Sequence, residues 1–525
     1  DPGVRKGRLA ESSPRRMGED KQRMLHRSQV MISLETILEG VDLLSPVPAD
    51  VPVQAISADS RRIQPGTAFV AIPGLIHDGA DFIPEAVRQG AAVIVCNGRS
   101  TTGSVAETVR TPVVQVRNPR QALSRMAANF YGHPSREMTM IGITGTNGKT
   151  TTAFLLNSIL DTHGLKTGLM GTLGLRAPGV RADSILTTPD SLQLQQTLRF
   201  FLDGGITHVI MEVSSHALEL NRVDTVEFDV AVFTNLSPEH LDFHLTMEDY
   251  FRAKARLFSS LDSGATAVLN GLDDRFESLR KMTPAKIVPY GSETSPVRFE
   301  QWGMSRDGIQ GTVRVEKERF DIHSPLLGVH NLENILSSIA VAWSLGISIE
   351  SIRGGIEACR SVPGRVERLT APNGATVILD YAHTPDAYHK LLSSLKNLLP
   401  RNGRLWVIFG CGGDRDRQKR PLMAQAAEEY AHEILVTPDN PRTEPVDSIN
   451  EDIKRGFHKN THRFVSNRAK AIRQAIGQLK PDDILAIVGK GRENYQIVGG
   501  EKVRHSDFEV ASQAIRSVGF EHDSI

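Results

Sequence analysis

Short apolar runs alternate with amphipathic segments over residues 31 to 138. The runs with the length and β-branched content of strands are TAFVAI (67–72), AAVIVC (91–96) and PVVQV (112–116). Stretches with apolar residues at helical spacing are ISLETILEG, directly after Met31, and RQALSRMAANF. This alternation predicts a small α/β domain over residues 31–138.

The pattern restarts at residue 139 with runs that are apolar throughout. These runs are TMIGIT (139–144), HVIMEV (208–213), FDVAVFTN (228–235) and TAVLN (266–270). Strands without apolar and polar alternation are typical of parallel sheets that helices cover on both faces. Residues 139–362 are therefore predicted to form a central domain built on a parallel sheet.

A third unit begins at residue 363, where Pro363 and Gly364 interrupt the preceding helical pattern. Its strand-like runs are ATVILDYA (375–382), RLWVIFG (404–410), EILVT (433–437) and DILAIVGKG (483–491). Helical patterns separate these runs, which predicts a doubly wound, Rossmann-like domain over residues 363–525. The whole chain is thus predicted to be an α/β protein of three domains, with ligands beyond the carboxyl ends of its strands.

Residues 1–30 are polar, rich in Arg and without apolar spacing, so they cannot offset the entropy of ordering, and we expect them to be disordered. Translation that starts upstream of the functional start is one explanation of this extension. A basic transit peptide is a weaker one, because Glu11, Glu19 and Asp20 dilute its charge.

Charge and cysteine content exclude several functions. The 525 residues carry 61 Lys and Arg against 61 Asp and Glu, so the overall charge favours neither nucleic acid nor a membrane surface. No run of eighteen apolar residues occurs. Cys96, Cys359 and Cys411 are too far apart for a disulfide framework or a zinc site. We expect a soluble, cytoplasmic monomer.

The stretch IGITGTNGKTTT (141–152) places three glycines between an apolar strand and a helix. Backbone N–H groups of such a loop, together with the helix N-terminus, close around phosphate oxygens. Lys149 is expected to reach the β and γ phosphates, and Thr150 to offer its hydroxyl to Mg²⁺. The strict Walker pattern fails at Ile143, where it has Gly, but the order of strand, turn, Lys-Thr and helix is satisfied.

Two polar residues follow the next apolar strands, Glu212 in VIMEVSSHAL and His240 in TNLSPEHLDFH. Alone, each fits a surface carboxylate or a loop histidine that water satisfies. At the carboxyl edge of one parallel sheet, beside a phosphate loop, they are candidate Mg²⁺ ligands.

Seven motifs together resemble the Mur ligase family, in order and spacing, over residues 32 to 518. They are GTNGKTT (145–151), EVSSHAL (212–218), TNLSPEHLDFH (234–244), YFRAKARLF (250–258), GVHNLENI (328–335), PGRVER (363–368) and DYAHTPD (380–386). Further motifs, among them DNPRTE (439–444) and GKGRENYQ (489–496), are similar to those of the member that adds the third residue of the peptidoglycan stem peptide.

The resemblance implies a UDP-binding first domain, a central ATPase and a Rossmann-like third domain that closes over the site. It implies that the γ phosphate of ATP passes to a substrate carboxylate and that an incoming amine attacks the acyl phosphate. This chemistry is sensible, because a phosphate leaving group removes the carboxylate charge that repels a nucleophile.

Site residues follow from the resemblance position by position. ATP is assigned to Gly145, Thr146, Asn147, Gly148, Lys149, Thr150, Thr151, Asn331 at the adenine, Arg365 at the phosphates and Asp380 at the ribose. Magnesium is assigned to Thr150, Glu212, His240 and a carbamylated Lys254, with Lys149, Glu212, His240 and Lys254 catalytic. The UDP-MurNAc-L-Ala-D-Glu substrate is assigned to Ser60, Thr187, Thr188, Ser214 and Arg222. From helical charge spacing alone, Lys254 would be an exposed surface residue.

The added amino acid is assigned to Arg415, Asp439, Asn440, Pro441, Arg442, Gly489 and Glu493. The planar fork of Arg442 suits the distal carboxylate of meso-diaminopimelate, which lysine lacks, and Glu493 could pair with the distal ammonium. The run from His77 to Ala80 in the first domain departs from the usual family pattern, and so does Leu186, which precedes Thr187 and Thr188. The uridine and sugar contacts are therefore the least determined.

Three alternatives remain open at this level. A lysine-adding ligase is the nearest enzymatic alternative. Folylpolyglutamate synthase shares the ATPase design, but the motifs DNPR (439–442) and LTTPD (186–190) give no support to a folate pocket. A plastid accessory protein of the transcription machinery, without ligase activity, is the alternative from another class.

Overall fold

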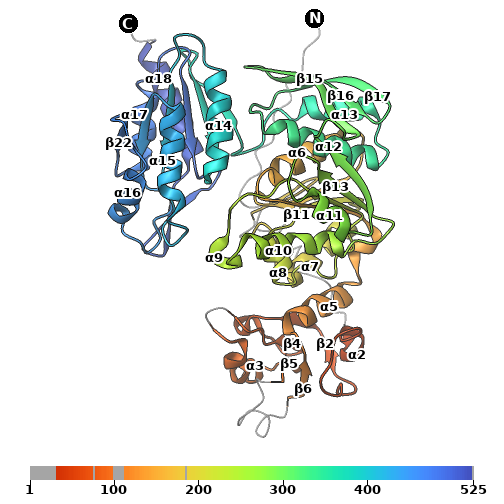
Figure 1. Ribbon diagram of the computed structural model, residues 1–525. Helices are drawn as coiled ribbons and strands as arrows, with labels where there is room; N and C mark the ends of the chain where they lie inside the picture. Colours follow the sequence, from red (N-terminus) through yellow and green to blue (C-terminus); the bar gives the residue numbers. More distant parts are fainter. Residues whose placement is uncertain (1–30, 75–76, 99–110, 184–185, 523–525) are drawn as a thin grey trace, which may run out of the picture. The chain divides into compact units, whose positions relative to one another are not determined.

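The computed structural model describes residues 31–74, 77–98, 111–183 and 186–522 (Figure 1). The predicted disorder of residues 1–30 lies outside these ranges. Within them, no helix has both the length and the apolar character that crossing a bilayer requires.

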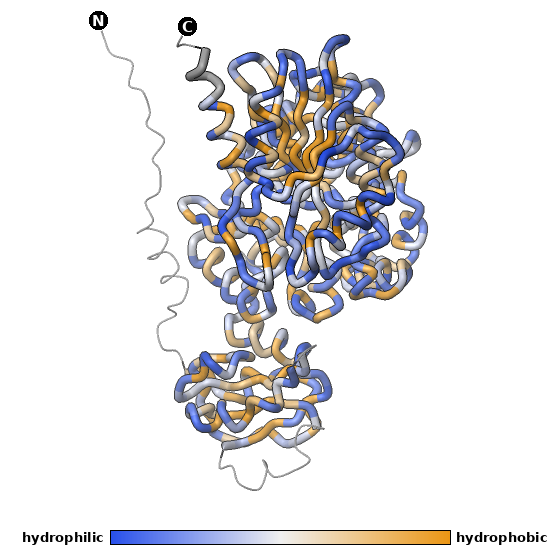
Figure 2. The backbone as a smooth tube through the Cα atoms, turned by 90° about the vertical axis from the view of Figure 1, so that its left-hand side faces the viewer, coloured by the Kyte–Doolittle hydropathy of each residue, from blue (hydrophilic) through white to orange (hydrophobic). Residues whose placement is uncertain are grey.

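The first α/β domain contains a parallel sheet in the order β3-β4-β5-β6. Its strands are β3 (Ala55–Ser57), β4 (Thr67–Val70), β5 (Val93–Asn97) and β6 (Val113–Val116). One face packs against α2 (Leu34–Ile37) and α5 (Pro119–Tyr131), and the other packs against α3 (Ile83–Arg88). Figure 2 shows the strands of this domain as mainly hydrophobic and the loops as hydrophilic.

The helix predicted over ISLETILEG is wrong in extent. Ile32 and Ser33 form the short strand β1 (Ile32–Ser33), which pairs with β2 (Pro52–Val53). Ser33 then caps α2 by accepting the N–H of Thr36, and the helix ends at Ile37. The segment does contain an amphipathic helix, but its first two residues pair with β2 and so lie in a strand.

The described chain divides into two units. The first comprises the residues up to 142 together with 165–229, and the second comprises 143–164 together with 230–525. The domain boundaries at 138 and 362 stay predictions.

The central domain contributes strands to both units. In the first unit their order is β10-β9-β8-β11-β7, with β8 and β11 parallel and β8, β9 and β10 antiparallel. They are β7 (Thr139–Thr144), β8 (Thr167–Gly171), β9 (Gly174–Ala177), β10 (Val180–Ala182) and β11 (His208–Glu212). The last residues of β7 already belong to the second unit. Helices of this region are α7 (Ser191–Asp203) and α8 (Ser215–Glu219).

In the second unit, the central strands run in the order β12-β13-β14-β15-β16-β17. They are β12 (Val230–Phe233), β13 (Thr266–Asn270), β14 (Lys286–Tyr290), β15 (Val297–Ser305), β16 (Gly308–Val315) and β17 (Glu318–Ser324). The predicted strands β12 and β13 are parallel, while β15, β16 and β17 form an antiparallel extension that the apolar pattern did not predict. The sheet of the central domain is therefore mixed rather than purely parallel.

Four central helices of the second unit carry parts of the motifs. They are α6 (Lys149–Thr162), α9 (Leu241–His244), α10 (Met247–Ser259) and α12 (Asn331–Ser344). Two further helices are α13 (Ile349–Ala358), which packs against α6, and α11 (Phe276–Met282), which lies beside β13. Helix α12 packs against α6, so the start of α12 lies near the start of the helix that follows the glycine-rich loop.

The third domain confirms the predicted doubly wound fold. Its sheet runs in the order β18-β19-β23-β20-β21-β22, parallel except for β18. The strands are β18 (Glu367–Thr370), β19 (Thr376–Asp380), β20 (Leu405–Phe409), β21 (Glu433–Val436), β22 (His462–Phe464) and β23 (Ile484–Val488), and β24 (Tyr495–Val498) and β25 (Glu501–Arg504) form a hairpin.

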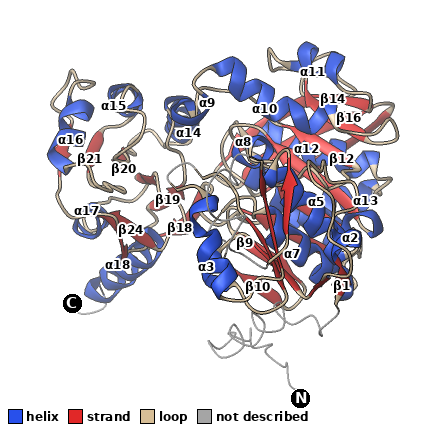
Figure 3. Ribbon diagram, turned by 90° about the horizontal axis from the view of Figure 1, so that it is seen from below, coloured by secondary structure: helices blue, strands red, loops and turns tan. Residues whose placement is uncertain are grey.

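Helices cover both faces of this sheet (Figure 3). One face packs against α14 (Pro385–Asn397), α15 (Lys419–Tyr430) and α16 (Val446–Lys454), and the other against α17 (Arg468–Ile476) and α18 (Asp507–His522). Each face therefore has its own apolar core.

A fully buried ion pair joins α17 to the start of α18. The Arg468 guanidinium donates to both carboxylate oxygens of Asp507, at 2.8 and 2.7 Å, and to the carbonyl of Val488 at 2.9 Å. Burial alone would raise the pKa of Asp507, but the Arg468 charge and the hydrogen bonds from Arg468 and His505 hold it well below its ordinary value.

Replacing this carboxylate is expected to destabilise the third domain. Asp507→Asn should cost about 3–5 kcal/mol near pH 7, because it leaves the Arg468 charge buried and unpaired. Since folding lowers the pKa of Asp507, its contribution is complete above about pH 4, the pKa of an unfolded Asp, and is lost as pH falls through the folded value. Urea unfolding of the wild type and of Asp507→Asn should therefore give free energies of unfolding whose difference narrows below about pH 4.

The control for this prediction is Glu509→Gln, which removes the partner of Arg504 in an exposed pair. Exposed pairs contribute little, so stability should hardly change. Equal losses of unfolding free energy in Asp507→Asn and Glu509→Gln would contradict the stabilising role of the buried pair.

Candidate active site

Residues 145–148 form the predicted phosphate loop between β7 and α6. Gly145 has φ +144° and Gly148 has φ +89°, values that side chains rarely allow. A Cβ at Gly145 would lie 1.9 Å from the Thr234 hydroxyl oxygen, and one at Gly148 would lie 2.3 Å from the side-chain oxygen of Asn334. Both glycines are required for the loop to close. Because α6 follows directly, the loop lies at a helix N-terminus, where phosphate binds favourably.

The residues that follow β12 hold the loop in shape. The backbone oxygen of Asn235 accepts the N–H of Thr146 at 2.8 Å, and its side-chain oxygen accepts that of Asn147 at 3.0 Å. The Thr234 hydroxyl donates to the carbonyl of Asn147 at 2.6 Å. Asn235 was not among the predicted site residues, although it ends the predicted run FDVAVFTN and belongs to the motif TNLSPEHLDFH.

The side-chain nitrogens of two lysines meet at the carbonyl oxygen of Gly145, Lys149 at 2.8 Å and Lys254 at 2.9 Å. Lys254, in α10, is 1% exposed and lies 4.5 Å from the centre of the Tyr250 ring. Burial and the nearby Lys149 charge lower the pKa of Lys254 well below its ordinary value. The interpretation of Lys254 as an exposed helix residue is wrong, and its environment favours a neutral amine.

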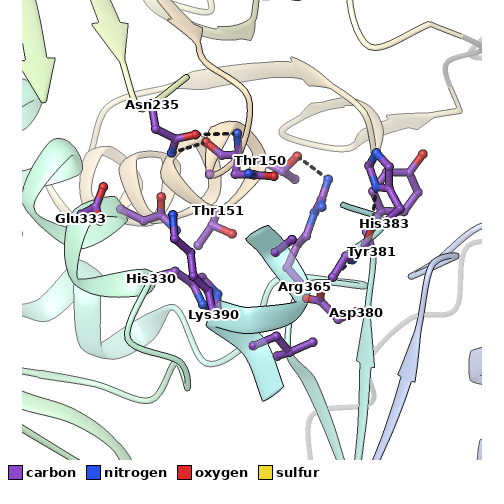
Figure 4. Close-up of a pocket in the computed structure, with 16 residues that line it drawn as sticks. Thr150, Thr151, Asn235, His330, Glu333, Arg365, Asp380, Tyr381, His383 and Lys390 are labelled. Carbon is purple, nitrogen blue, oxygen red and sulfur yellow. Dashed lines mark hydrogen bonds between the residues drawn. The ribbon is translucent and has the colours of Figure 1, made fainter. Parts of the chain in front are cut away.

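A pocket opens beside the loop, between the start of α12 and the strand end at β19 (Figure 4). Its walls come from the phosphate loop and α6, from α12 and from the linker into the third domain. The lining residues that the sequence analysis assigned to ATP are Asn147, Gly148, Thr150, Thr151, Arg365 and Asp380. Segments far apart in the chain therefore meet around one cavity.

Arg365 and Asp380 shape one wall of this pocket. Arg365 donates to the hydroxyl of Thr150 at 3.4 Å, and its guanidinium lies 4.7 Å from the centre of the Tyr381 ring (Figure 4). The two carboxylate oxygens of Asp380 accept the N–H groups of Val366 and Ala382, each at 2.7 Å. Asp380 thus fixes the linker at Val366 and the backbone just after β19 at Ala382, and it also lines the pocket.

Asn331 is not among the residues that line this pocket. Its side chain is buried, donates to the carbonyl of Leu327 at 2.7 Å and accepts from Asn334 at 2.8 Å. The neighbouring residues His330, Glu333 and Asn334 line the pocket instead.

A carboxylate that the sequence analysis missed lies next to His240. Glu239 contacts His383 of the third domain, with 2.8 Å between Oε1 and Nε2, and its Oε2 lies 3.6 Å from His240. Burial alone would raise the pKa of Glu239, but the hydrogen bond from His383 and the charges of His383, His240 and Lys149 hold it well below its ordinary value. The only sequence signal for Glu239 was its position beside the predicted ligand His240.

Glu212 lies at the end of β11 and is 1% exposed. Its two oxygens accept the N–H and the hydroxyl of Thr172, at 2.9 and 3.1 Å. Over the described residues, no group of three or more His, Cys, Asp and Glu side chains is gathered as a protein metal cage would require.

Four of the residues assigned to the UDP-linked substrate lie together in the first unit. Thr188 donates to the carbonyl of Glu212 at 2.9 Å, its hydroxyl accepts the N–H of Ser214 at 3.0 Å, and its own carbonyl accepts from Arg222 at 3.1 Å. Thr187 contacts the hydroxyl of Thr172 at 3.2 Å.

Ser60 lies in the first α/β domain, separate from those four residues along the chain. It is buried, and its hydroxyl donates to Glu85 at 3.1 Å. The contact of Ser60 with the substrate stays a prediction.

The residues assigned to the incoming amino acid gather at the carboxyl edge of the third sheet. Gly489 has φ +109°, and a Cβ there would lie 2.5 Å from a carboxylate oxygen of Asp439. Glu493 accepts from Asn440 at 3.1 Å and from Lys490 at 2.7 Å. Lys490, which the sequence analysis missed within GKGRE, is fully buried and also donates to the Asn440 side chain at 3.0 Å.

Two arginines complete this edge. Arg442 donates to the carbonyl of Gly413 at 2.7 Å, and Arg415 pairs with Asp242 of α9 at 3.4 Å. Burial lowers the pKa of Arg442, and the Arg415 charge lowers it further. Two guanidinium groups that repel one another form a favourable site for a carboxylate.

The fold and this site define a phosphate-loop protein with an α/β first domain, a mixed central sheet and a doubly wound third domain. Family models match three consecutive regions: "Mur ligase family, catalytic domain" over residues 52–131, "Mur ligase middle domain" over 143–342, and "Mur ligase, glutamate ligase domain" over 364–491.

Relatives match over nearly the whole chain. A UDP-N-acetylmuramoyl-L-alanyl-D-glutamate--2,6-diaminopimelate ligase of Bacillus cereus is 40% identical over 492 residues, covering 92% of this chain and 98% of the relative. The ligase of the same name from Geobacter sulfurreducens is 41% identical, covering 89% and 95%. A solved structure with that name has a TM-score of 0.66 at 30% identity and covers 93% and 99%. The chain belongs to the Mur ligase family, as its motifs predicted.

Proposed function

We propose that this protein is an ATP-dependent ligase that adds meso-diaminopimelate to UDP-MurNAc-L-Ala-D-Glu in peptidoglycan precursor synthesis. The observation that carries the proposal is the meeting of the phosphate loop with Arg365 in one pocket, in a chain whose 40% identical relatives have this ligase name. The proposal includes a monomer that acts in the cytoplasm, where ATP and UDP-linked precursors are available.

Phosphoryl transfer from ATP is the first step. The loop amides and the N-terminus of α6 hold the phosphates, while Lys149 and Arg365 bring positive charge to the transferring group. The substrate carboxylate attacks the γ phosphate, ADP leaves, and an acyl phosphate remains. Stabilising the charge that develops in this transfer is what the cationic side chains contribute.

Magnesium fits the donor chemistry of the site. Mg²⁺ usually retains several waters and binds substrate phosphates with few protein ligands, so the absence of a three-residue cage among the described side chains does not exclude it. Thr150, Glu212, His240 and a carbamylated Lys254 would hold it. When bound, the ion neutralises phosphate charge during transfer.

Carbamylation of Lys254 would add a carboxylate to this set. The reaction needs a neutral amine to attack carbon dioxide, and burial of Lys254 favours that form. The product is an anion. The adjacent Lys149, whose charge disfavours the protonated form of Lys254, would attract this anion.

The second step joins the amine to the activated carbonyl. Thr187, Thr188, Ser214, Arg222 and Ser60 bind the UDP-linked substrate, and the third domain presents the amino acid. The amine attacks the acyl phosphate, inorganic phosphate leaves, and the amine loses its proton. Asn331 is assigned to the adenine in this proposal, and its side chain is held by Leu327 and Asn334.

Selection of diaminopimelate is assigned to the distal end of the amino acid. Arg442 and Arg415 bind the carboxylate that lysine lacks, and Glu493 binds the distal ammonium, with Asp439, Asn440, Pro441 and Gly489 shaping the loops around it. A lysine substrate would leave the Arg442 guanidinium without the carboxylate that it is proposed to bind, and Arg415 with Asp242 alone.

The decisive experiment combines purified protein with ATP, Mg²⁺, UDP-MurNAc-L-Ala-D-Glu and either diaminopimelate or lysine. The expected result is ADP release together with a product whose mass shows addition of diaminopimelate. Preference for lysine would favour the lysine-adding alternative. No turnover with either amino acid would favour an accessory role such as that of the plastid proteins.

In the same assay, Arg442→Lys is expected to lower kcat/KM for diaminopimelate about 10- to 100-fold, because lysine keeps the charge but loses the bidentate fork. The KM for ATP should stay the same. Lysine is a matched replacement, since it keeps a side chain at this left-handed position. An unchanged kcat/KM would remove Arg442 from substrate recognition.

A further inference from the structure

Two loops of the third domain lie backbone against backbone beside the Arg442 side chain. They are residues 410–416, after β20, and 438–444, after β21. The N–H of Gly413 donates to the carbonyl of Asn440 at 3.0 Å, and a Cβ at Gly413 would lie 1.9 Å from the carbonyl oxygen of Pro441. We call them the arginine loops, because they carry Arg415 and Arg442.

A single buried guanidinium ties the arginine loops together from behind. Arg420, in α15, is 0% exposed and donates to both carboxylate oxygens of Glu444, at 2.8 and 2.6 Å. It also donates to the carbonyl of Gly412 at 3.1 Å. Gly412 belongs to the first loop and Glu444 to the second, so Arg420 fixes one loop against the other.

Glu444 makes a second connection between the loops. It accepts the N–H of Asp414 at 3.1 Å, and Asp414 in turn accepts the N–H and the hydroxyl of Thr443, at 3.0 and 2.8 Å. These contacts are made by Thr443 and Glu444, the two residues that follow Arg442, while Arg442 itself donates to the carbonyl of Gly413. The hydrogen bond from Arg420 is the main cause that lowers the pKa of Glu444 to about 2, so the pair stays ionic at neutral pH.

We propose that Arg420 and Glu444 are positioning residues that set the arginine loops for the incoming amino acid and thereby its selection. The inference rests on the proposed function, because it assigns the carboxylate of diaminopimelate to Arg442 and Arg415. Neither Arg420 nor Glu444 touches the substrate in this proposal. A guanidinium fork recognises a carboxylate only when it is held within about 0.5 Å and 10–20° of the productive geometry, and two loops alone do not give that precision.

The chain offers a matched control within the same ion cluster. Asp452, in α16, is also a buried carboxylate partner of Arg420, at 2.9 Å. In the described part of the chain, Asp452 also accepts from the guanidinium groups of Arg417, at 2.9 Å, and Arg455, at 3.0 Å. Asp452→Asn and Glu444→Gln therefore each remove one carboxylate from the same buried arginine, but only Glu444 joins the arginine loops.

The test compares wild type, Glu444→Gln, Glu444→Asp and Asp452→Asn by kcat/KM for diaminopimelate and for lysine, and by KM for ATP. Both Glu444 variants are expected to lower the ratio of the two efficiencies at least 10-fold, mainly by raising KM for diaminopimelate, with KM for ATP unchanged. Asp452→Asn should lose thermal stability and keep the ratio. Glu444→Asp keeps the charge, so it provides the readout if Glu444→Gln fails to fold.

Three outcomes separate the claims. An unchanged ratio in the folded Glu444 variants, or the same fall in Asp452→Asn, overturns the positioning role and reduces the cluster to a stabilising ion network. A wild-type enzyme that does not prefer diaminopimelate overturns the proposed function itself. A fall in the ratio that only the Glu444 variants show supports the inference.

Discussion

Lys149→Met is expected to lower the rate of ligation by about 10³-fold or more, with ADP release falling to the same extent. Removing a cation that stabilises transferring phosphoryl charge has effects of this size. The structure places the Lys149 ammonium at the phosphate loop itself, held by the carbonyls of Gly145 and Thr146. Steady-state measurement of ADP release with saturating substrates checks the prediction.

Lys286→Met is the control for this change, because Lys286 is an exposed residue of β14 outside the pocket. Its rate should equal that of the wild type. A folded Lys149→Met protein with more than about a tenth of wild-type activity would contradict the assignment of Lys149 to phosphate binding.

The second large effect is expected at Lys254. Lys254→Ala should lower the ligation rate about 10²- to 10³-fold, because it removes the amine that carbon dioxide would convert into a carboxylate ligand. Acetate or formate should restore part of the activity, since a small carboxylate can enter the space left by the side chain. Rates measured over a range of acetate concentrations check this, and the mass of the wild-type protein in bicarbonate should increase by one carbon dioxide.

Lys149→Met is the matched comparison for the rescue. A phosphate-binding cation cannot be replaced by an anion, so acetate should leave that variant inactive. Rescue of neither variant, together with a wild-type mass that bicarbonate does not change, would mean that Lys254 acts only as a buried cation beside Gly145.

The buried strands could be predicted because they are apolar throughout. TAVLN and HVIMEV became β13 and β11 with little change at their ends. Strands β15 to β17 were missed, because most of their residues are partly or fully exposed and several are charged. A half-exposed antiparallel extension gives a weaker apolar signal than a strand covered on both faces.

The candidate site could be predicted only in part. Glycines at the phosphate loop are identifiable from local sequence, because the strand, the turn and the helix are adjacent in the chain. The contact between Lys254 and Gly145 joins residues 109 positions apart, so helical spacing alone suggested an exposed lysine. Asn331 and Asn334 lie one turn apart on α12, and only the packing of that helix decides which of them lines the pocket.

Arg442 has a φ of +54°, in the left-handed region that residues with a side chain seldom occupy. Such a backbone costs about 1–2 kcal/mol, which the paired N–H and carbonyl of this residue, bonded to Ile497 and Gly499, help to offset. An alanine at this position would keep that strain and lose the guanidinium, whereas a glycine would relieve it. In the proposed function, recognition of a carboxylate by the guanidinium is the gain that would accompany this local cost in stability.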